Sequence, residues 1–209
     1  MTDRPADRPA DRPADRRVLT LDFDGVIASP FFGRNLGIHR SFLDPSAPPR
    51  PARVPPRWLG DPLDYLRYEP RRPLAEAREA LQRLASVRRL VVLTGRRSHP
   101  GRWMRRYGLA QYIDGVVINE GVQRSPHYKL AELQRLGARE HVEDDPRTAQ
   151  LLAEHGIQVY LRDWPRNRGL TYHPKVERIS DIGELATRLT AGDPSSSGPA
   201  SEDRAAGEQ

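Results

Sequence analysis

Two aspartates two residues apart, Asp22 and Asp24, end an apolar run near the start of the chain. The run 18–21 predicts a buried strand, and alternate side chains of a strand share one face. In an open α/β sheet, the carboxyl ends of the strands form the edge where ligands bind. Two neighbouring carboxylates repel each other, and a hard divalent cation is the usual remedy. An Asp-Gly turn after a strand would leave the same pattern, so the interpretation depends on partners elsewhere in the chain.

Three further polar groups follow in order. Thr94 and Gly95 end a second apolar run, Lys129 lies near the start of a predicted helix, and Glu143 and Asp144 end a third run. Carboxylate oxygens are the ligands that Mg²⁺ prefers. A hydroxyl, an unhindered backbone N–H and a lysine are suited to bind phosphoryl oxygens and offset their charge. Together these groups predict phosphoryl chemistry at a magnesium site.

Apolar runs and helical patterns alternate along the chain between these groups. Further strands are expected at 89–95, 115–118, 139–142 and 157–161, with 176–179 extending the sheet. Helices are expected at 74–84, 98–107, 125–136, 145–156 and 180–189. Strands that alternate with helices of this length indicate βαβ units. The expected fold class is therefore α/β, a Rossmann-like, largely parallel sheet with helices on both faces.

Composition divides the chain into a core and two tails. Residues 1–16 contain three copies of Asp-Arg-Pro-Ala, and residues 191–209 have no large apolar side chain. Both tails are predicted to be disordered. The catalytic domain is expected at 17–190. Within it, residues 27–73 are rich in proline, which prevents a long regular element, and we expect a small cap-like insertion there.

Charge and cysteine content narrow the function classes. The chain of 209 residues has no cysteine, which excludes a disulfide framework and a thiolate zinc site. The absence of a long apolar stretch predicts a soluble, cytoplasmic protein without a membrane partner. The net charge of +6 raises the alternative of nucleic-acid binding. However, the arginines are spread over the whole sequence, which favours a solvated basic surface over a binding groove.

The order of the motifs resembles the haloacid dehalogenase superfamily of aspartyl-phosphate phosphatases. The motifs are Asp-Phe-Asp-Gly-Val at 22–26, Thr-Gly-Arg at 94–96, the lone Lys129, and Glu-Asp-Asp at 143–145. The resemblance covers the core from Val18 to about Leu189. It implies that Asp22 is the nucleophile and Asp24 the general acid and base. It also implies that Thr94 and Lys129 bind the phosphoryl group.

The same resemblance implies a bound Mg²⁺. Asp22, Asp144 and the backbone carbonyl of Asp24 would be its ligands, with Glu143 nearby. Which acidic residue of the motif at 143–145 touches the metal stays open, because Asp145 before Pro146 is also a good helix cap. We favour Asp144 as the ligand and a mainly structural role for Asp145.

A narrower resemblance concerns substrate. The loop 163–168 is similar to one in deoxyribonucleotidase-like (5′-nucleotidase) members, and the insertion stands where those proteins carry a cap. The expected function is a Mg²⁺-dependent phosphomonoesterase acting on a small phosphorylated substrate, with nucleotides as one class. The alternatives are a phosphatase of nucleic-acid ends or phosphoproteins, and a non-catalytic Arg-rich nucleic-acid-binding module. Arg96 and Arg166 are candidates for substrate contact, and a surface role is equally expected for each.

Overall fold

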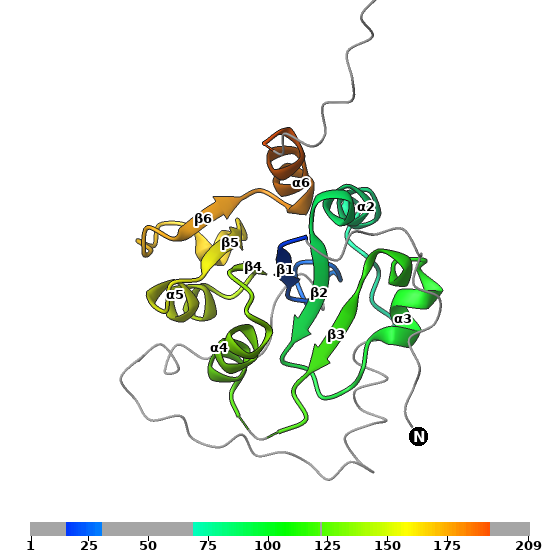
Figure 1. The fold of residues 1–209 in the computed structure, drawn as a ribbon, viewed down its shortest axis with the longest axis horizontal. Helices are drawn as coiled ribbons and strands as arrows, with labels where there is room; N and C mark the ends of the chain where they lie inside the picture. Colours follow the sequence, from blue (N-terminus) through cyan, green and yellow to red (C-terminus); the bar gives the residue numbers. More distant parts are fainter. Residues whose placement is uncertain (1–15, 31–68, 122, 193–209) are drawn as a thin grey trace, which may run out of the picture.

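A single parallel sheet forms the centre of the molecule. The computed structural model describes residues 16–30, 69–121 and 123–192. Within them six strands lie in the order β3-β2-β1-β4-β5-β6, and each strand is parallel to its neighbours (Figure 1). The strands are β1 (Val18–Leu21), β2 (Arg89–Thr94), β3 (Gly115–Ile118), β4 (Glu140–Glu143), β5 (Gln158–Arg162) and β6 (Val176–Ile179). The predicted α/β fold class is confirmed.

Helices cover both faces of this sheet. The α-helices are α2 (Ala77–Val87), α3 (Gly101–Arg106), α4 (Ser125–Leu136), α5 (Pro146–Glu154) and α6 (Ile182–Ala191), and short 3₁₀ turns are η3 (Ala110–Tyr112) and η4 (Pro165–Asn167). The helices α2, α3 and α6 pack on one face, and α4 and α5 pack on the other (Figure 1). Each face therefore has its own apolar core, as expected for a parallel sheet buried on both sides.

The strand order reverses direction at β1. From β1 the chain proceeds to β2 and β3 on one side, then crosses to β4, β5 and β6 on the other. Ligands of open α/β sheets bind at the point where this order reverses, outside the carboxyl ends of the strands. Here that point lies between β1 and β4. The residues that follow these two strands, including Asp22 and Asp144, therefore lie at this switch point.

Capping residues mark one end of each of three helices at the positions expected from the sequence. Gly137 ends α4 with a φ of +63°, a conformation that glycine adopts at little cost. The side chain of Asp145 accepts a hydrogen bond from the backbone N–H of Arg147 at the start of α5. Asp181 does the same for Glu184 at the start of α6. Local sequence signals are therefore sufficient to delimit these three helices.

The first helix after the insertion starts later than predicted. Pro73 does not open the helix, because it forms an isolated antiparallel bridge with Ala28. The backbone N–H of Ser29 also donates to the carbonyl of Arg72. The two described ends of the predicted insertion are thus joined side by side, and α2 begins only at Ala77. A long-range pairing has displaced a local helix-start signal.

The next helix, α3, is also shorter than the predicted 98–107. Pro100 precedes its first turn, and the side chain of His99 accepts a hydrogen bond from the N–H of Gly101. Residues 98–100 therefore form a turn that leads into the helix. At the other end, Gly108 adopts a positive φ, as the predicted stop requires.

Several predictions concern residues 1–15, 31–68, 122 and 193–209, which lie outside the described residues. They are the predicted disorder of the two tails and the predicted cap-like character of most of the insertion. Within the part of the chain that the structure describes, no helix has the length and apolar character needed to cross a membrane.

Candidate active site

The carboxyl ends of β1 and β4 bring three buried carboxylates together. Asp22 follows β1, Glu143 is the last residue of β4, and Asp144 follows it. One carboxylate oxygen of each lies within 4.8 Å of the others. The backbone N–H of Asp22 donates to the carbonyl of Val142, at 2.9 Å, and so fixes the end of β1 against β4. Oxygen ligands at this spacing could hold a hard divalent cation.

Lys129 reaches this cluster from α4. Its Nζ lies 3.0 Å from Asp22 Oδ1 and 2.8 Å from Glu143 Oε2, and its side chain is only 2% exposed. Burial by itself lowers a lysine pKa, but the two carboxylates raise the pKa of Lys129 above its ordinary value. Lys129 therefore stays positively charged inside the protein. The predicted lysine and the predicted nucleophile are direct neighbours.

The carboxyl groups of the cluster differ in how readily they ionise. Burial alone would raise the pKa of Glu143, but Lys129 and a hydrogen bond from His141 lower it to about 2. Burial raises the pKa of Asp22 well above its ordinary value, although Lys129 opposes the shift. Burial and the charge of Glu143 raise the pKa of Asp144 to about 7. The two aspartates would therefore ionise more readily with a further positive charge beside them.

Glu143 is held by four hydrogen-bond donors. Its Oε1 accepts the backbone N–H groups of Asp144 and Asp145, each at 3.1 Å. Its Oε2 accepts Lys129 and lies 2.9 Å from Nε2 of His141. The sequence analysis did not select His141. A histidine inside a buried parallel strand, where both faces are usually apolar, was the signal that could have identified it.

Asp24 has different partners, all of them arginines. Arg96 forms a two-pronged contact with its carboxylate, through Nε at 2.7 Å and Nη2 at 2.5 Å. Arg71 donates to Oδ1 of the same carboxylate, the oxygen that Nη2 of Arg96 also contacts. Arg96 also lies over the ring of Phe23, 4.4 Å from its centroid. The sequence analysis named Arg96 but missed Arg71, because nothing local distinguishes Arg71 from the adjacent Arg72.

The carbonyl of Arg71 explains how this arginine is placed. It accepts hydrogen bonds from Nε1 of Trp103 at 2.9 Å and from the hydroxyl of Tyr107 at 3.2 Å. Both donors belong to the region of α3, and Trp103 packs edge-on against Phe23, with ring centroids 4.9 Å apart. The end of the insertion is thus anchored beside Asp24.

The loop after β5 closes the other side of the site. Arg166 donates to the carbonyl of Asp144 at 3.0 Å and to its Oδ2 at 2.5 Å. Nδ2 of Asn167 donates to the same carbonyl at 3.1 Å. Trp164 donates through Nε1 to the carbonyl of Gly25 at 3.2 Å. Arg166, a predicted candidate, therefore contacts the acidic cluster directly.

Gly25 has to be a glycine at this position. Its φ is +78°, and a Cβ built on it would lie 2.0 Å from Oδ2 of Asp144. The chain thus turns immediately after Asp24 and lets the carboxylate of Asp144 come close to the backbone.

Thr94 and Gly95 lie at the end of the neighbouring strand. Thr94 is the last residue of β2. The register pairs Leu21, the last residue of β1, with Val92, so the carboxyl ends of the two strands lie at the same edge of the sheet. Thr94 is buried, and its Oγ1 accepts the N–H of Arg96 at 3.3 Å. A Cβ on Gly95 would lie 2.6 Å from Oγ of Ser125, so glycine allows the first turn of α4 to approach this strand end.

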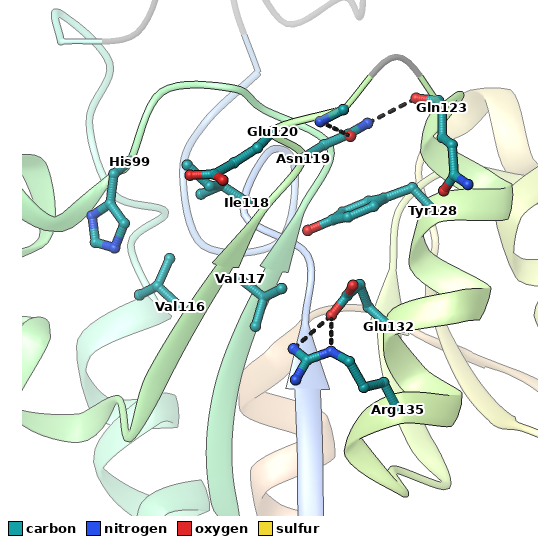
Figure 2. Close-up of a pocket in the computed structure, with 11 residues that line it drawn as sticks. His99, Val116, Val117, Ile118, Asn119, Glu120, Gln123, Tyr128, Glu132 and Arg135 are labelled. Carbon is teal, nitrogen blue, oxygen red and sulfur yellow. Dashed lines mark hydrogen bonds and ion pairs between the residues drawn. The ribbon is translucent and has the colours of Figure 1, made fainter.

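A separate hollow of about 550 Å³ lies between β3 and α4 (Figure 2). It is lined by none of the predicted site residues. The ring of Tyr128 points toward β3, and its buried hydroxyl has no hydrogen-bond partner among the described residues. Glu132 and Arg135 form an ion pair at the same wall. Two adjacent residues of α4 therefore point to different places: Lys129 contacts the acidic cluster, and Tyr128 lines this hollow.

Comparison with known proteins identifies the fold. No protein-family model and no curated protein sequence matches the chain significantly. Among solved structures, a haloacid dehalogenase (HAD)-superfamily hydrolase, subfamily IA, variant 1, from Geobacter sulfurreducens is similar with a TM-score of 0.52 and 22% identity, covering 83% of this chain and 99% of that chain. L-2-haloacid dehalogenase from Xanthobacter autotrophicus, with chloropropionic acid covalently bound, gives 0.56 and 14%, covering 85% and 99%. CbbY from Rhodobacter sphaeroides, in complex with phosphate, gives 0.54 and 14%, covering 81% and 96%.

These neighbours define the class of fold. The described core has the haloacid dehalogenase-like fold, which agrees with the resemblance seen in the motifs. The identities are low, so the chemistry of this chain has to be argued from its own site. Nothing among these neighbours bears on the narrower resemblance to deoxyribonucleotidases.

Proposed function

We propose that the protein is a phosphomonoesterase that acts through an aspartyl-phosphate on Asp22. The observation that carries the proposal is the contact of Asp22 with Lys129, at 3.0 Å, beside Asp144 in a buried cluster at the switch point of the sheet. A carboxylate nucleophile requires that the negative charge of the attacked phosphoryl group be offset nearby. Lys129, together with Thr94 and Gly95 at the next strand end, provides groups for that purpose.

The residues present fit a bound Mg²⁺. Burial raises the pKa values of two carboxyl groups, Asp22 and Asp144, in spite of nearby cations, and both groups offer oxygens to a further positive charge. The missing Cβ of Gly25 leaves room for Asp144 against the backbone that carries the Asp24 carbonyl. Asp22, Asp144 and that carbonyl would hold the ion, with Glu143 adjacent. When bound, Mg²⁺ would neutralise charge on the carboxylates and on phosphoryl oxygens.

The steps assigned to the protein are two displacements at phosphorus. An oxygen of Asp22 attacks, the bond to the ester oxygen breaks, and the departing oxygen takes a proton from Asp24. A water molecule then attacks the aspartyl-phosphate and gives a proton to Asp24, which releases inorganic phosphate and Asp22. Three N–H groups of Arg71 and Arg96 donate to the carboxylate of Asp24 and occupy both of its oxygens. We therefore expect these guanidinium groups to loosen their contact when an ester binds.

Charge balance supports a single phosphate dianion as the reacting group. Four carboxylates of the site form ion pairs with four cationic side chains: Asp22, Asp24, Glu143 and Asp144 with Lys129, Arg71, Arg96 and Arg166. A divalent cation together with a dianionic ester adds no net charge to this set. The neighbour CbbY is in complex with phosphate, which supports a phosphate group as a ligand of this fold.

We extend the proposal to small phosphate esters, with nucleotides as one class to be examined. Nucleic-acid ends and phosphoproteins are the alternative substrates, and the Arg-rich binding module is the non-enzymatic alternative. The lysine and the paired acids at one strand edge favour catalysis over the last of these, because a binding surface does not need a buried nucleophile.

The test is a panel of phosphate esters with MgCl₂, using wild-type protein and Asp22→Asn. We expect phosphate release by the wild type and none by the variant with any ester. Mass spectrometry of acid-quenched wild type should detect a phosphoryl group on the peptide that carries Asp22. Full turnover by Asp22→Asn, or in excess chelator, would contradict the proposal. Salt-dependent retention of DNA or RNA by both proteins, without phosphate release, would favour the binding module.

A further inference from the structure

A row of buried polar side chains continues from the nucleophile into the protein interior. Lys129 contacts Asp22 and Glu143, Glu143 contacts His141, and Nδ1 of His141 lies 2.8 Å from Oγ1 of Thr20. Thr20 and His141 are completely buried, and His141 is the one buried histidine among the described residues. Parallel strands covered on both faces normally have apolar residues at such positions. Polar groups there cost stability unless each has its hydrogen-bond partner.

The hydrogen-bond chemistry of the ring fixes the place of its proton. Both oxygens of Glu143 already accept hydrogen bonds from groups that can only donate, Lys129 and two backbone N–H groups, so Nε2 of His141 donates the hydrogen of its contact with Oε2. On the other side of the ring, Oγ1 of Thr20 lies 2.8 Å from Nδ1 and donates to the backbone carbonyl of Glu140 at 3.0 Å. Thr20 thus connects the ring to the first residue of β4 and holds its orientation.

We propose that Thr20 and His141 are positioning residues that hold Glu143, and through it Lys129, in register with the nucleophile. This inference rests on the proposed function, because it concerns the residues that would bind and attack the phosphoryl group. Among the described residues, neither Thr20 nor His141 forms a hydrogen bond or ion pair with Asp22. They act because Oε2 of Glu143 receives two donors, the ring and Lys129, and both are needed to fix its direction.

A purely structural role makes a different prediction. If the pair only filled space, an apolar pair of similar shape would preserve function, since replacing both partners of a buried hydrogen bond can be nearly neutral for stability. If the pair positions Glu143, the same replacement would leave stability nearly unchanged but would free the carboxylate to rotate. Lys129 would then lose its fixed distance from Asp22.

The first experiment determines the ring form without any substrate. ¹⁵N–¹H correlation spectra of the imidazole groups in the full chain should show one ring protonated at Nε2 and protected from exchange. Its absence in His141→Gln assigns that signal. We expect the Nε2–H signal to persist in Thr20→Ser and to broaden by exchange in Thr20→Val. A wild-type ring of His141 without a proton on Nε2 would overturn the donor role given to His141.

The second experiment uses matched pairs of variants. The side-chain amide of His141→Gln can still donate to Glu143, whereas His141→Leu cannot, and Thr20→Ser keeps the hydroxyl that Thr20→Val loses. We expect kcat to fall about 10- to 100-fold in the Leu and Val variants, the range found for supporting residues around metal ligands. The Gln and Ser variants should retain most of kcat. The single Leu and Val variants each remove one partner of a buried hydrogen bond and should lower the melting temperature, whereas the double variant Thr20→Val/His141→Leu replaces both partners and should stay close to the wild type in melting temperature while losing kcat.

Binding of inorganic phosphate with MgCl₂, measured by calorimetry, makes the test independent of turnover. Affinity should fall in the Leu and Val variants and be preserved in the Gln and Ser variants. Equal kcat and equal phosphate affinity across each pair would overturn the positioning role while leaving the phosphatase proposal intact. Absence of phosphate release by the wild type with every ester would instead refute the proposed function, and the phosphate affinities would still decide whether the pair positions Lys129.

Discussion

Asp22 and Asp24 are two residues apart in sequence, but they differ in burial and in the charged side chains that contact them. Asp22 faces a buried lysine and two further acids, and its pKa is raised by burial. Asp24 is 21% exposed at its side chain and is held by the guanidinium groups of Arg71 and Arg96. A point charge on an inward-facing lysine suits a fixed nucleophile, and the partly exposed side chain of Asp24 suits a carboxyl group that has to exchange protons with substrate and water. The same residue type is thereby prepared for two roles.

The largest expected effect is on the rate of ester hydrolysis by Asp24→Asn, and it should depend on the leaving group of the ester. Asp24→Asn should slow hydrolysis of alkyl phosphates on the order of 10² to 10⁴-fold, because the departing alkoxide needs a proton. Nitrophenolate departs without one, so nitrophenyl phosphate should give a burst of one product per site followed by slow turnover. Rapid-quench measurement of both esters checks this prediction.

The matched control for that experiment is Asp22→Asn, which should show no burst with either ester. Equal slowing of both esters by Asp24→Asn, again without a burst, would assign Asp24 to the metal site alone. The comparison between the two aspartates would then fail.

The second prediction compares the stability contributed by the two sets of ion pairs. Lys129→Met leaves Asp22 and Glu143 without their buried cation and should destabilise the protein by about 3–5 kcal/mol, as loss of one partner from a buried pair typically does. Arg96→Met should cost much less, since Asp24 keeps Arg71 and some contact with water. Urea unfolding followed by circular dichroism measures both variants. Similar losses would show that burial does not distinguish the two pairs.

The third prediction uses pH to test the acidic cluster without divalent cations. The pKa of Asp144 is about 7 in the folded protein against 3.8 ordinarily, so folding favours its protonated form. That stabilisation is fully present below the lower value and is lost as pH rises through the higher one. The melting temperature should therefore fall as pH rises from about 4 to about 7 and should level off above that. MgCl₂ should raise it more at the upper pH, where Asp144 is ionised.

The variants Asp144→Asn and Asp145→Asn provide the control for this pH dependence. Asn at 144 cannot ionise and should abolish the Mg²⁺-dependent rise. Asp145 caps α5 through its side-chain oxygen, and asparagine also makes a good cap, so Asp145→Asn should behave like the wild type. Loss of the response in Asp145→Asn, with retention in Asp144→Asn, would transfer the metal ligand to Asp145.

The smallest effect is expected for Arg71→Gln, with Arg72→Gln as its control. Arg71 is buried against Asp24, whereas the adjacent Arg72 is exposed. Removing Arg71 leaves the two-pronged contact of Arg96, so alkyl phosphate hydrolysis should change less than about 10-fold, below the range for losing the acid itself. Arg72→Gln should have no measurable effect. Kinetics with one alkyl ester and one nitrophenyl ester compare the two variants.

Much of the fold was predictable from local patterns. The apolar runs at 89–94 and 115–118, the Ser-Pro start and Gly137 stop of α4, and the Asp caps of α5 and α6 are found where they were expected. These signals rest on the chemistry of neighbouring residues, which folding does not alter. The start of α2 was wrong because Pro73 pairs with Ala28, a partner far away in the sequence.

The site, like the fold, has features that the sequence predicts and features that depend on the tertiary structure. The sequence by itself determined which strand ends carry the acids, the Thr-Gly turn and the lysine, because a parallel sheet brings those ends to one edge. Only the tertiary structure decided which partner each side chain takes. Arg71 rather than Arg72 contacts Asp24, and His141 and Thr20 fix Glu143, because strand register and helix packing bring together side chains up to about 120 residues apart. Ionisation follows those contacts, since burial and nearby charge, and not residue type, set the pKa of each group.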